Sequence, residues 1–137
     1  MGNVVMLNNS VIAWKSHHQP TVALSTMESE YMALTDAMKA LKWVRTLLSE
    51  LGCSHGKPDK STELFSDNQG AIAFAKNPVS HSRAKHIDLR HHFICEAIQD
   101  RIIWVQYIPT TEMTADSLTK ALGREKHEKC MIRMGMI

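Results

Sequence analysis

Three acidic residues stand where a folded α/β domain can bring carboxylates together. Glu30 belongs to the first long helical pattern, Asp67 follows a short strand pattern, and Asp116 lies at the start of a short helical pattern. Carboxylate oxygens are ligands that magnesium prefers, and two such ions about 3.5–4 Å apart can hold the attacking water and the leaving oxygen of a phosphodiester. The joint placement of the three acids therefore indicates metal-assisted phosphodiester hydrolysis, with all three as metal ligands.

Helical periodicity assigns Glu30, rather than Glu28, to the sheet-facing side of its helix. Steps of three and four residues from Glu28 follow a mostly solvent-facing line. The same steps from Glu30 reach core residues, namely Leu34, Ala37 and Leu41. An acid on a buried face needs a charged partner or a metal ion, because an unpaired buried charge is costly.

Each acid also has a purely structural alternative. Glu30 is near enough to the start of its helix to interact favourably with the helix dipole. Asp67 can be the N-cap of the helix that follows it. Asp116 can stabilise the first turn of its own helix without any function.

A basic, histidine-rich segment spans residues 76–90. Asp88 is its single acid, whereas its basic and imidazole side chains are those of Lys76, His81, Arg83, Lys85, His86 and Arg90. Such a segment can face nucleic-acid phosphates, or it can be a solvated helix face. A histidine here could carry a proton in hydrolysis, since its ordinary pKa is about 6.5. His91 and Cys95 share a predicted helix face, but no second Cys/His pair has ligand spacing, so zinc is not favoured.

Hydrophobic periodicity predicts a mixed α/β domain in which helices cover a small sheet. Ser25 begins a capping box and Gly52 supplies a helix stop. The expected strands cover 4–7, 11–15, 62–66 and 101–108, and the expected helices cover 27–51, 69–76, 87–100 and 112–122, with one more short helix within 124–134. The three tryptophans fall within these elements, so we expect them in the core.

Length and composition are those of one ordinary globular domain. The chain has 137 residues, of which 44% are hydrophobic. Its formal net charge is only +2, so the net charge alone does not indicate a nucleic-acid partner. Three widely spaced cysteines suggest free thiols rather than disulfides. No targeting segment or long apolar run is present in the sequence, so we expect an intracellular protein, cytoplasmic or nuclear, without membrane contact.

A series of short motifs resembles the ribonuclease H end of copia-type retrotransposon polyproteins. Their order and spacing agree over nearly the whole chain. The motifs are Ala13-Trp14-Lys15-Ser16, Gln19-Pro20, Ser25 through Leu34, Asp67-Asn68-Gln69 with Ala71-Ile72, Asn77-Pro78, His81 through Arg90, and Thr114-Ala115-Asp116 with Leu118-Thr119-Lys120.

The resemblance implies a ribonuclease H-like fold over residues 1–123, with 124–137 as a tail or short helix. The implied activity is hydrolysis of the RNA strand of an RNA/DNA hybrid during reverse transcription, with Mg²⁺ or Mn²⁺ in a two-ion site. Glu30, Asp67 and Asp116 match three of the family's four catalytic acids, and His86 matches a residue that assists product release. By the same resemblance, the expected phosphate contacts are Lys15, Arg83, Lys85 and Arg90. The expected partners are the hybrid and the reverse transcriptase portion of the same polyprotein.

One strand of the family pattern, which carries the first catalytic aspartate, has no counterpart before the hairpin that begins at Val4. In the family this strand lies inside the sheet, between the hairpin and the strand ending at Asp67. Its loss predicts impaired catalysis and two unpaired strand edges, through which the chain could associate with itself. Three outcomes stay open: another chain or an upstream segment supplies the strand, the hairpin closes onto the remaining sheet, or the chain is a decayed fragment. Two functions other than hydrolysis also stay open, a catalytically inactive nucleic-acid-binding module and a small α/β interaction domain.

Overall fold

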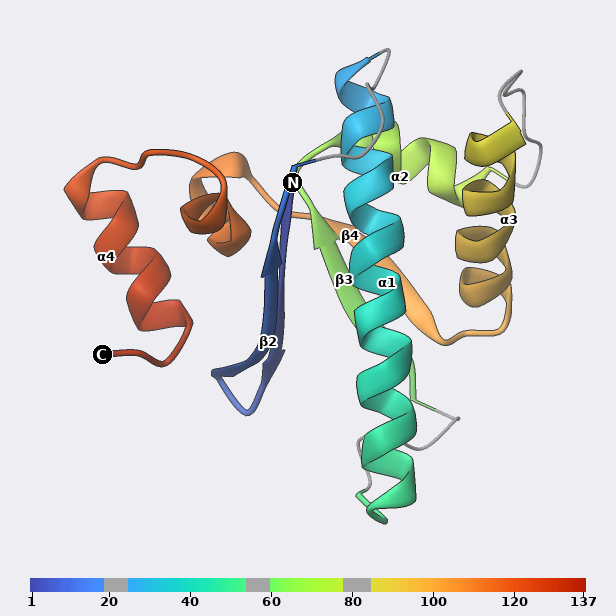
Figure 1. Cartoon of the computed structure of the whole chain (residues 1–137), viewed down its shortest axis with the longest axis horizontal. Helices are drawn as coiled ribbons and strands as arrows, with labels where there is room; N and C mark the ends of the chain where they lie inside the picture. Colours follow the sequence, from blue (N-terminus) through green and yellow to red (C-terminus); the bar gives the residue numbers. More distant parts are fainter. Residues whose placement is uncertain (19–24, 54–59, 78–84) are drawn as a thin grey trace.

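A computed structural model describes residues 1–18, 25–53, 60–77 and 85–137, with residues 85–88 described by their backbone alone. Figure 1 shows a mixed α/β arrangement, as predicted. The hairpin and the C-terminal helix lie on one side of the long helix α1, and α2 and α3 lie on the other. No helix in the described part of the chain is long and apolar enough to cross a membrane.

The N-terminal hairpin consists of β1 (Gly2–Leu7) and β2 (Ser10–Ser16), which pair antiparallel. Asn8 and Asn9 form the two-residue turn with φ angles of 50° and 61°. Both angles lie in the left-handed region that asparagine tolerates and that tight hairpin turns require. The predicted hairpin is confirmed.

The long helix α1 (Thr26–Glu50) begins and ends at the predicted signals. The Ser25 side chain accepts a hydrogen bond from the Glu28 backbone N–H, and Gly52 follows the helix with a φ of 72°. Three other predicted elements are found where the pattern placed them, with small shifts at their ends, as β3 (Thr62–Ser66), α2 (Gln69–Lys76) and α3 (Lys85–Gln99). β4 (Ile103–Tyr107) pairs parallel with β3.

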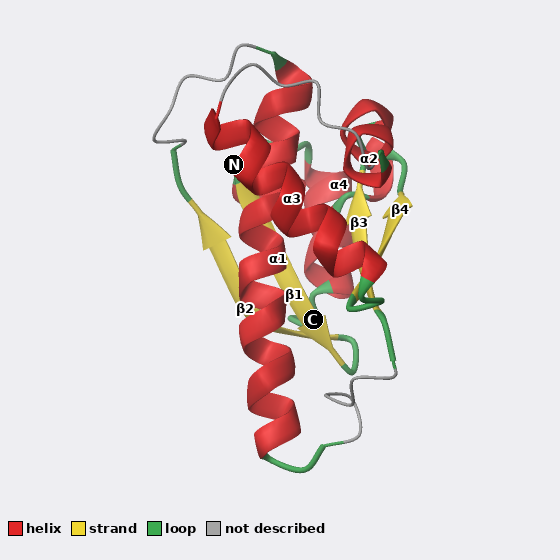
Figure 2. Ribbon diagram, turned by 90° about the vertical axis from the view of Figure 1, so that its right-hand side faces the viewer, coloured by secondary structure: helices red, strands yellow, loops and turns green. Residues whose placement is uncertain are grey.

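The hydrophobic core lies where α1, α2 and α3 cover one face of the β3–β4 pair (Figure 2). Its almost completely buried members come from α1, α2, α3 and β4, including Tyr31, Met38, Ala75, Ile94 and Val105, and the partly buried Leu64 of β3 packs against them. The Tyr31 and Phe74 rings meet edge to face, with their centroids 5.0 Å apart. This dense packing fixes the strand that leads to Asp67 against the helix that carries Glu30.

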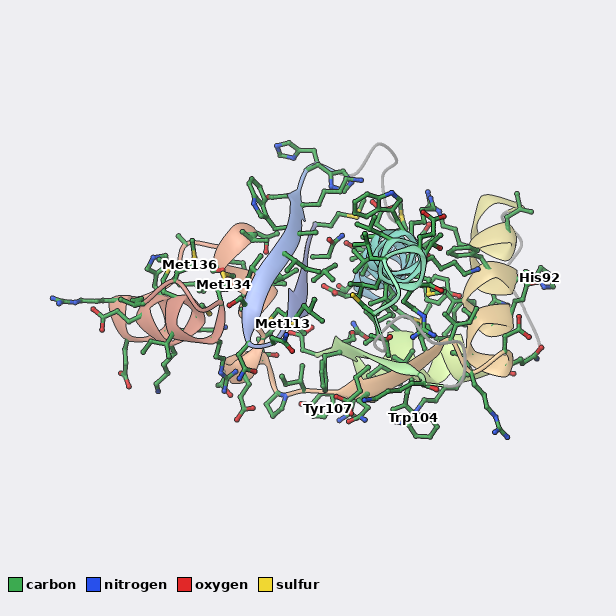
Figure 3. All side chains as sticks on the ribbon, turned by 90° about the horizontal axis from the view of Figure 1, so that it is seen from below. His92, Trp104, Tyr107, Met113, Met134 and Met136 are labelled. Atoms are coloured by element: carbon green, nitrogen blue, oxygen red, sulfur yellow. The ribbon has the colours of Figure 1, made fainter. Side chains whose placement is uncertain are left out.

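The expectation of buried tryptophans was wrong. Trp14, Trp43 and Trp104 are all more than half exposed. Trp104 lies on the face of β4 that no described helix covers, and Figure 3 shows it pointing away from the helices. Trp14 and Trp43 lie on outward faces of β2 and α1, because strand and helix periodicity place only alternate positions or one stripe toward a core.

The predicted helix over 112–122 was also wrong. Two short 3₁₀ helices occupy this region, η2 (Thr110–Glu112) and η3 (Thr114–Leu118). Here the Ser117 hydroxyl donates to the Thr114 carbonyl, and Lys126 donates to the Thr110 carbonyl. Side chains that capture backbone carbonyls compete with α-helical hydrogen bonds, which favours the tighter turns. The last helix, α4 (Arg124–Arg133), is an α-helix within the predicted range.

The four strands in the described residues make two separate two-stranded sheets, β1–β2 and β3–β4, rather than one small sheet. β1 packs against α1 and η3 instead of pairing with β3. The hairpin has therefore not closed onto the β3–β4 pair, which removes one of the three outcomes left open by the sequence.

Candidate active site

A groove with a volume of about 870 Å³ separates the two sheets. β1 and β3 form its two sides, and α1 contributes apolar side chains between them, including Leu34, Ala37 and Leu41. Glu30, Asp67 and Lys120 also line the groove, as does the N-terminal residue Met1. The start of α1, the carboxyl end of β3 and the N-terminus lie at the same end (Figure 1), so one end of the groove is charged and its middle is apolar.

The surroundings of Glu30 in the groove raise the pKa of its carboxyl group. Burial raises the pKa of its carboxyl group, and the nearby charges of Asp67 and Asp116 raise that pKa further. The ammonium groups of Lys120 and of the N-terminus act in the opposite direction. The three predicted acids therefore interact electrostatically, and an added positive charge would relieve the repulsion among them.

Asp67 follows the last residue of β3 and lines the groove. Its alternative role as an N-cap is wrong, because the Asn68 side chain caps α2 by accepting the Ala71 backbone N–H at 2.9 Å. The neighbouring Ser66 hydroxyl accepts the Asn68 backbone N–H. With the cap supplied by Asn68, the Asp67 carboxylate is not needed to begin the helix.

Asp116 lies in η3, is 6% exposed, and is held by two lysines. Lys120 Nζ lies 2.8 Å from Asp116 Oδ1, and Lys126 Nζ lies 2.7 Å from Oδ2. Burial by itself would raise the pKa of this carboxyl, but the hydrogen bonds and charges of the two lysines outweigh burial and lower it. The dipole interaction expected in the first turn of an α-helix does not apply, because η3 is a single 3₁₀ segment.

The side chains in place do not by themselves make a metal site. Among those that the structure describes, no group of three His, Cys, Asp or Glu side chains could hold a metal ion. Both Asp116 oxygens accept hydrogen bonds from lysines, and only Glu30 and Asp67 of the predicted ligands line the groove. Ammonium groups supply the positive charge here, so a metal ion would need a further ligand beside Glu30 and Asp67.

Lys120 and Lys126 are site residues that the sequence analysis did not assign. The spacing of Asp116 and Lys120, four residues apart, could have suggested the first pair. Lys126 comes from α4, ten residues after Asp116, and its contact depends on how α4 docks. α4 is itself attached to the hairpin, since the Val11 backbone N–H donates to the Met134 carbonyl.

Comparison with known proteins gives a consistent set of relatives. The chain is 40% identical over 135 residues to the retrovirus-related Pol polyprotein from transposon TNT 1-94 of Nicotiana tabacum, covering 98% of this chain and 10% of that protein. It is 36% identical over 136 residues to the corresponding protein from transposon RE2 of Arabidopsis thaliana, covering 99% of this chain and 9% of that protein. The chain is homologous to retrotransposon Pol polyproteins.

The match is to a part of much longer proteins. The chain spans about a tenth of the length of these relatives. A yeast relative, the Transposon Ty1-NL2 Gag-Pol polyprotein, is 27% identical over 123 residues, which covers 89% of this chain and 7% of that protein. No family model and no solved structure matches the chain.

Of the two glutamates at the start of α1 in this Pol homologue, one faces the predicted direction and the other does not. Glu30 lines the groove, as the helical spacing indicated, but Glu28 is 7% exposed rather than solvent-facing. Two residues on the same line as Glu28, Met32 and Thr35, are also buried. The buried arc of α1 is wide because the hairpin contacts the helix on one side while α2 and α3 pack on another.

The predicted phosphate-binding residues are not gathered into one described surface. Lys15 lies on β2 and its Nζ is 3.2 Å from Asp36 Oδ2 of α1. Arg90 lies on α3, on the other side of α1, and its buried Nη1 atom has no hydrogen-bond partner among the described residues. Arg83 lies outside the described residues, and Lys85 and His86 lie in α3 where only the backbone is described.

His91 and Cys95 do share a helix face, as predicted, but they belong to the core. His91 is completely buried, its Nε2 lies 3.2 Å from the Phe74 carbonyl oxygen, and the Cys95 sulfur lies 3.4 Å from the same nitrogen. The Cys95 thiol also donates to the Ala75 carbonyl, and burial raises its pKa. The pair joins α3 to the end of α2.

Proposed function

We propose that this chain is the ribonuclease H part of a retrotransposon Pol polyprotein, which hydrolyses the RNA strand of RNA/DNA hybrids, and that its activity is impaired until a strand carrying the first catalytic aspartate is supplied. The observation that carries the proposal is that Glu30 and Asp67, acids from separate elements, line the same end of one groove in a chain whose homologues are Pol polyproteins. Reverse transcription leaves such hybrids as intermediates, so the substrate belongs to the same replication cycle.

Within this proposal, each group of residues has a distinct role. Glu30 and Asp67 face the groove and would hold the reacting phosphodiester region together with Mg²⁺ or Mn²⁺ and a further ligand. Lys15, Arg83, Lys85 and Arg90 would contact phosphates and position the hybrid without reading its sequence. His86 would assist product release. The reverse transcriptase portion of the polyprotein would be the protein partner, in an intracellular particle or the nucleus.

Cleavage of a labelled RNA/DNA hybrid in magnesium tests the proposal. The chain as given is compared with a version extended at its N-terminus by a strand carrying an aspartate, each beside its Asp67→Asn variant. We expect cleavage to be weak or absent in the chain as given, to appear in the extended version, and to disappear with Asp67→Asn. Folded but inactive versions of both, checked by circular dichroism, would contradict the proposal.

A second function, binding of nucleic acid without cleavage, is favoured by the two lysines on Asp116. A carboxylate whose two oxygens each accept a bond from an ammonium group is already charge-balanced and has less affinity for a metal ion. Electrophoretic mobility shift of the same hybrid distinguishes this function. Binding that weakens with salt while no cleavage occurs in either version would favour it over hydrolysis.

A further inference from the structure

We propose that α4 is a removable clasp on Asp116, so that docking of α4 and binding of a divalent cation at Asp116 oppose each other. Lys126 of α4 supplies the contact, and release of the helix leaves one carboxylate oxygen of Asp116 free. The inference rests on the proposed function only in taking Asp116 as a ligand of the cation. It adds a conformational control that hydrolysis itself does not require.

Lys126 holds α4 against the preceding segment at two points. Its ammonium group donates to Asp116 Oδ2 at 2.7 Å and to the Thr110 carbonyl oxygen at 2.8 Å. The side chain of Asp116 is 7% exposed and that of Lys126 is 28% exposed, so solvent screens this ion pair less than it screens a surface pair. A divalent cation on the same oxygen would lie beside the ammonium group, and the two like charges would repel each other. Lys126 and the cation therefore compete for Asp116.

Lys120 contacts the other oxygen of Asp116 but does not link that residue to α4. It follows Asp116 by four residues on the same segment, and its side chain is 54% exposed. Its ammonium group can therefore move into solvent without changing the attachment of any helix. Lys126 is the partner that comes from another element, so the loss of its contact weakens the docking of α4.

The other contacts that attach α4 are largely polar. Arg133 donates to the Glu112 carbonyl oxygen, and the Val11 backbone N–H donates to the Met134 carbonyl oxygen at 3.2 Å. Cys130 is the buried residue within α4, and Met134 at its end is buried too. The helix lies on the far side of the hairpin from α1, and the core cluster draws its members from other elements (Figure 1). Because elements with few buried apolar contacts open locally at less cost than global unfolding, α4 can detach while the core stays folded.

The acids around Asp116 favour a cation once the clasp is open. The charges of Asp67 and Asp116 raise the pKa of the Glu30 carboxyl group, so the three acids are close enough to interact. Departure of Lys126 removes one positive charge from this region and leaves the repulsion among the acids less balanced. A small divalent cation that prefers oxygen ligands, such as Mg²⁺, restores the balance.

Thermodynamic linkage makes the competition measurable from either side. If docking of α4 weakens cation binding by some factor, cation binding weakens the docking of α4 by the same factor. We expect this factor to be roughly tenfold, which lies within the usual range for coupling between two sites. The position of α4 and the affinity for the cation are therefore two independent readouts of one effect.

The thiol of Cys130 reports whether α4 is docked. Cys130 is buried, whereas Cys53 is exposed and Cys95 is intermediate, so a thiol reagent reaches Cys130 when the helix is released. The reaction of each cysteine of the full chain with N-ethylmaleimide is followed by mass spectrometry of peptides, in MgCl₂ and in KCl of equal ionic strength. The KCl sample is needed because salt alone weakens an ion pair. We expect Mg²⁺ to speed the reaction of Cys130 up to roughly tenfold and to leave Cys53 and Cys95 unchanged.

Three variants make the result specific. Lys126→Met should speed the reaction of Cys130 without Mg²⁺, and it should tighten Mg²⁺ binding about tenfold in isothermal titration calorimetry. Lys129→Met, on the same helix, should change neither quantity, because the Lys129–Glu125 pair is exposed. Asp116→Asn should also free α4, but it should bind Mg²⁺ more weakly than the unmodified chain does. Each variant is first checked for a native circular dichroism spectrum, and the measurement on the unmodified chain needs no variant.

Three outcomes would overturn the clasp. The first is a reaction of Cys130 that Mg²⁺ does not speed although calorimetry detects Mg²⁺ binding. The second is equal Mg²⁺ affinity of the unmodified and Lys126→Met chains, and the third is no Mg²⁺ binding by either of them.

The cleavage assay decides the proposed function separately. Cleavage by the extended version together with a Cys130 reaction that is indifferent to Mg²⁺ would support hydrolysis and overturn the clasp. A Cys130 reaction that depends on Mg²⁺, without cleavage in either version, would support the clasp and contradict hydrolysis.

Discussion

The two sides of α1 differ in how completely they are packed. On one side α2, α3 and the β3–β4 pair enclose a core in which Met38, Ile94 and Val105 are almost inaccessible to solvent. On the other side the hairpin is separated from β3 by the groove and is connected to α4 and η3. The helix-covered side therefore has its own complete core, whereas the hairpin side depends on polar contacts and on whatever fills the groove.

The charges follow the same division. On the hairpin side Asp116 is paired with Lys120, which follows η3, and with Lys126 of α4, and both lysines lower its pKa. Glu30 faces the groove, and burial with like charges raises its pKa. An ionised carboxylate therefore stabilises the folded state at Asp116 and opposes it at Glu30, according to which neighbours the tertiary structure supplies.

The largest expected difference in stability is between a valine-to-alanine substitution in the helix-covered core and the same substitution in the hairpin. Val105→Ala should lower the free energy of unfolding by roughly 2–3 kcal/mol, because it removes two methyl groups from a close-packed site. Val5→Ala should cost less than about 1 kcal/mol, because Val5 already lines a cavity. Urea unfolding of both variants checks this. Equal losses would show that the hairpin side is packed as tightly as the core.

Removal of the paired charge should have the next largest effect. Asp116→Asn should destabilise the fold at pH 7 by about 1–2 kcal/mol, because two charge-assisted hydrogen bonds are weakened. Since the folded pKa of Asp116 is lowered, its contribution is present above the unfolded pKa and is lost as pH falls through the folded one. Unfolding at several pH values should therefore show a shallower acid limb in the variant. If stability fell with pH as steeply in the variant as in the unmodified chain, the loss of stability in acid would come from other carboxylates.

Substitutions of two lysines on α4 distinguish the effect of a tertiary contact on stability from the effect of removing any positive charge. Lys126→Met should cost about 1 kcal/mol, because Lys126 binds both Asp116 and the Thr110 carbonyl. Lys129→Met should change stability by less than about 0.5 kcal/mol, because the Lys129–Glu125 pair is exposed. Thermal unfolding compares them. A larger effect of Lys129→Met would mean that α4 is held by its exposed pairs instead.

The smallest effect should have the opposite sign. Glu30→Gln should stabilise the folded state at pH 7 by a few tenths of a kcal/mol, about the size of other partly exposed charge effects. The folded pKa of Glu30 is raised, so its ionisation disfavours folding as pH rises above the unfolded value, and this difference vanishes at lower pH. Stability measured at pH 4 and pH 7 checks the trend. A loss of stability at pH 7 would indicate that the Glu30 carboxylate has a stabilising partner.

Elements with strong local signals were the predictable part of the fold. The capping serine, the two turn asparagines and the stop at Gly52 act through backbone conformation near their own positions, so their effects appear directly in the sequence. The segment after Pro109 was mispredicted, because Lys126 and Ser117 capture carbonyls that an α-helix would use. One of these two contacts comes from another element, and no local pattern contains it.

The candidate site divides in the same way. Periodicity by itself determined that Glu30 lies on the groove side of its helix and that Asp67 follows a strand, because both depend only on the repeat of one element. Only the tertiary structure decided that Glu28 is also buried, that Asn68 rather than Asp67 caps α2, and that two lysines hold Asp116. Those outcomes depend on which elements meet, and among the described residues β1 and β3 do not pair, so the hairpin packs beside the β3–β4 sheet without joining it.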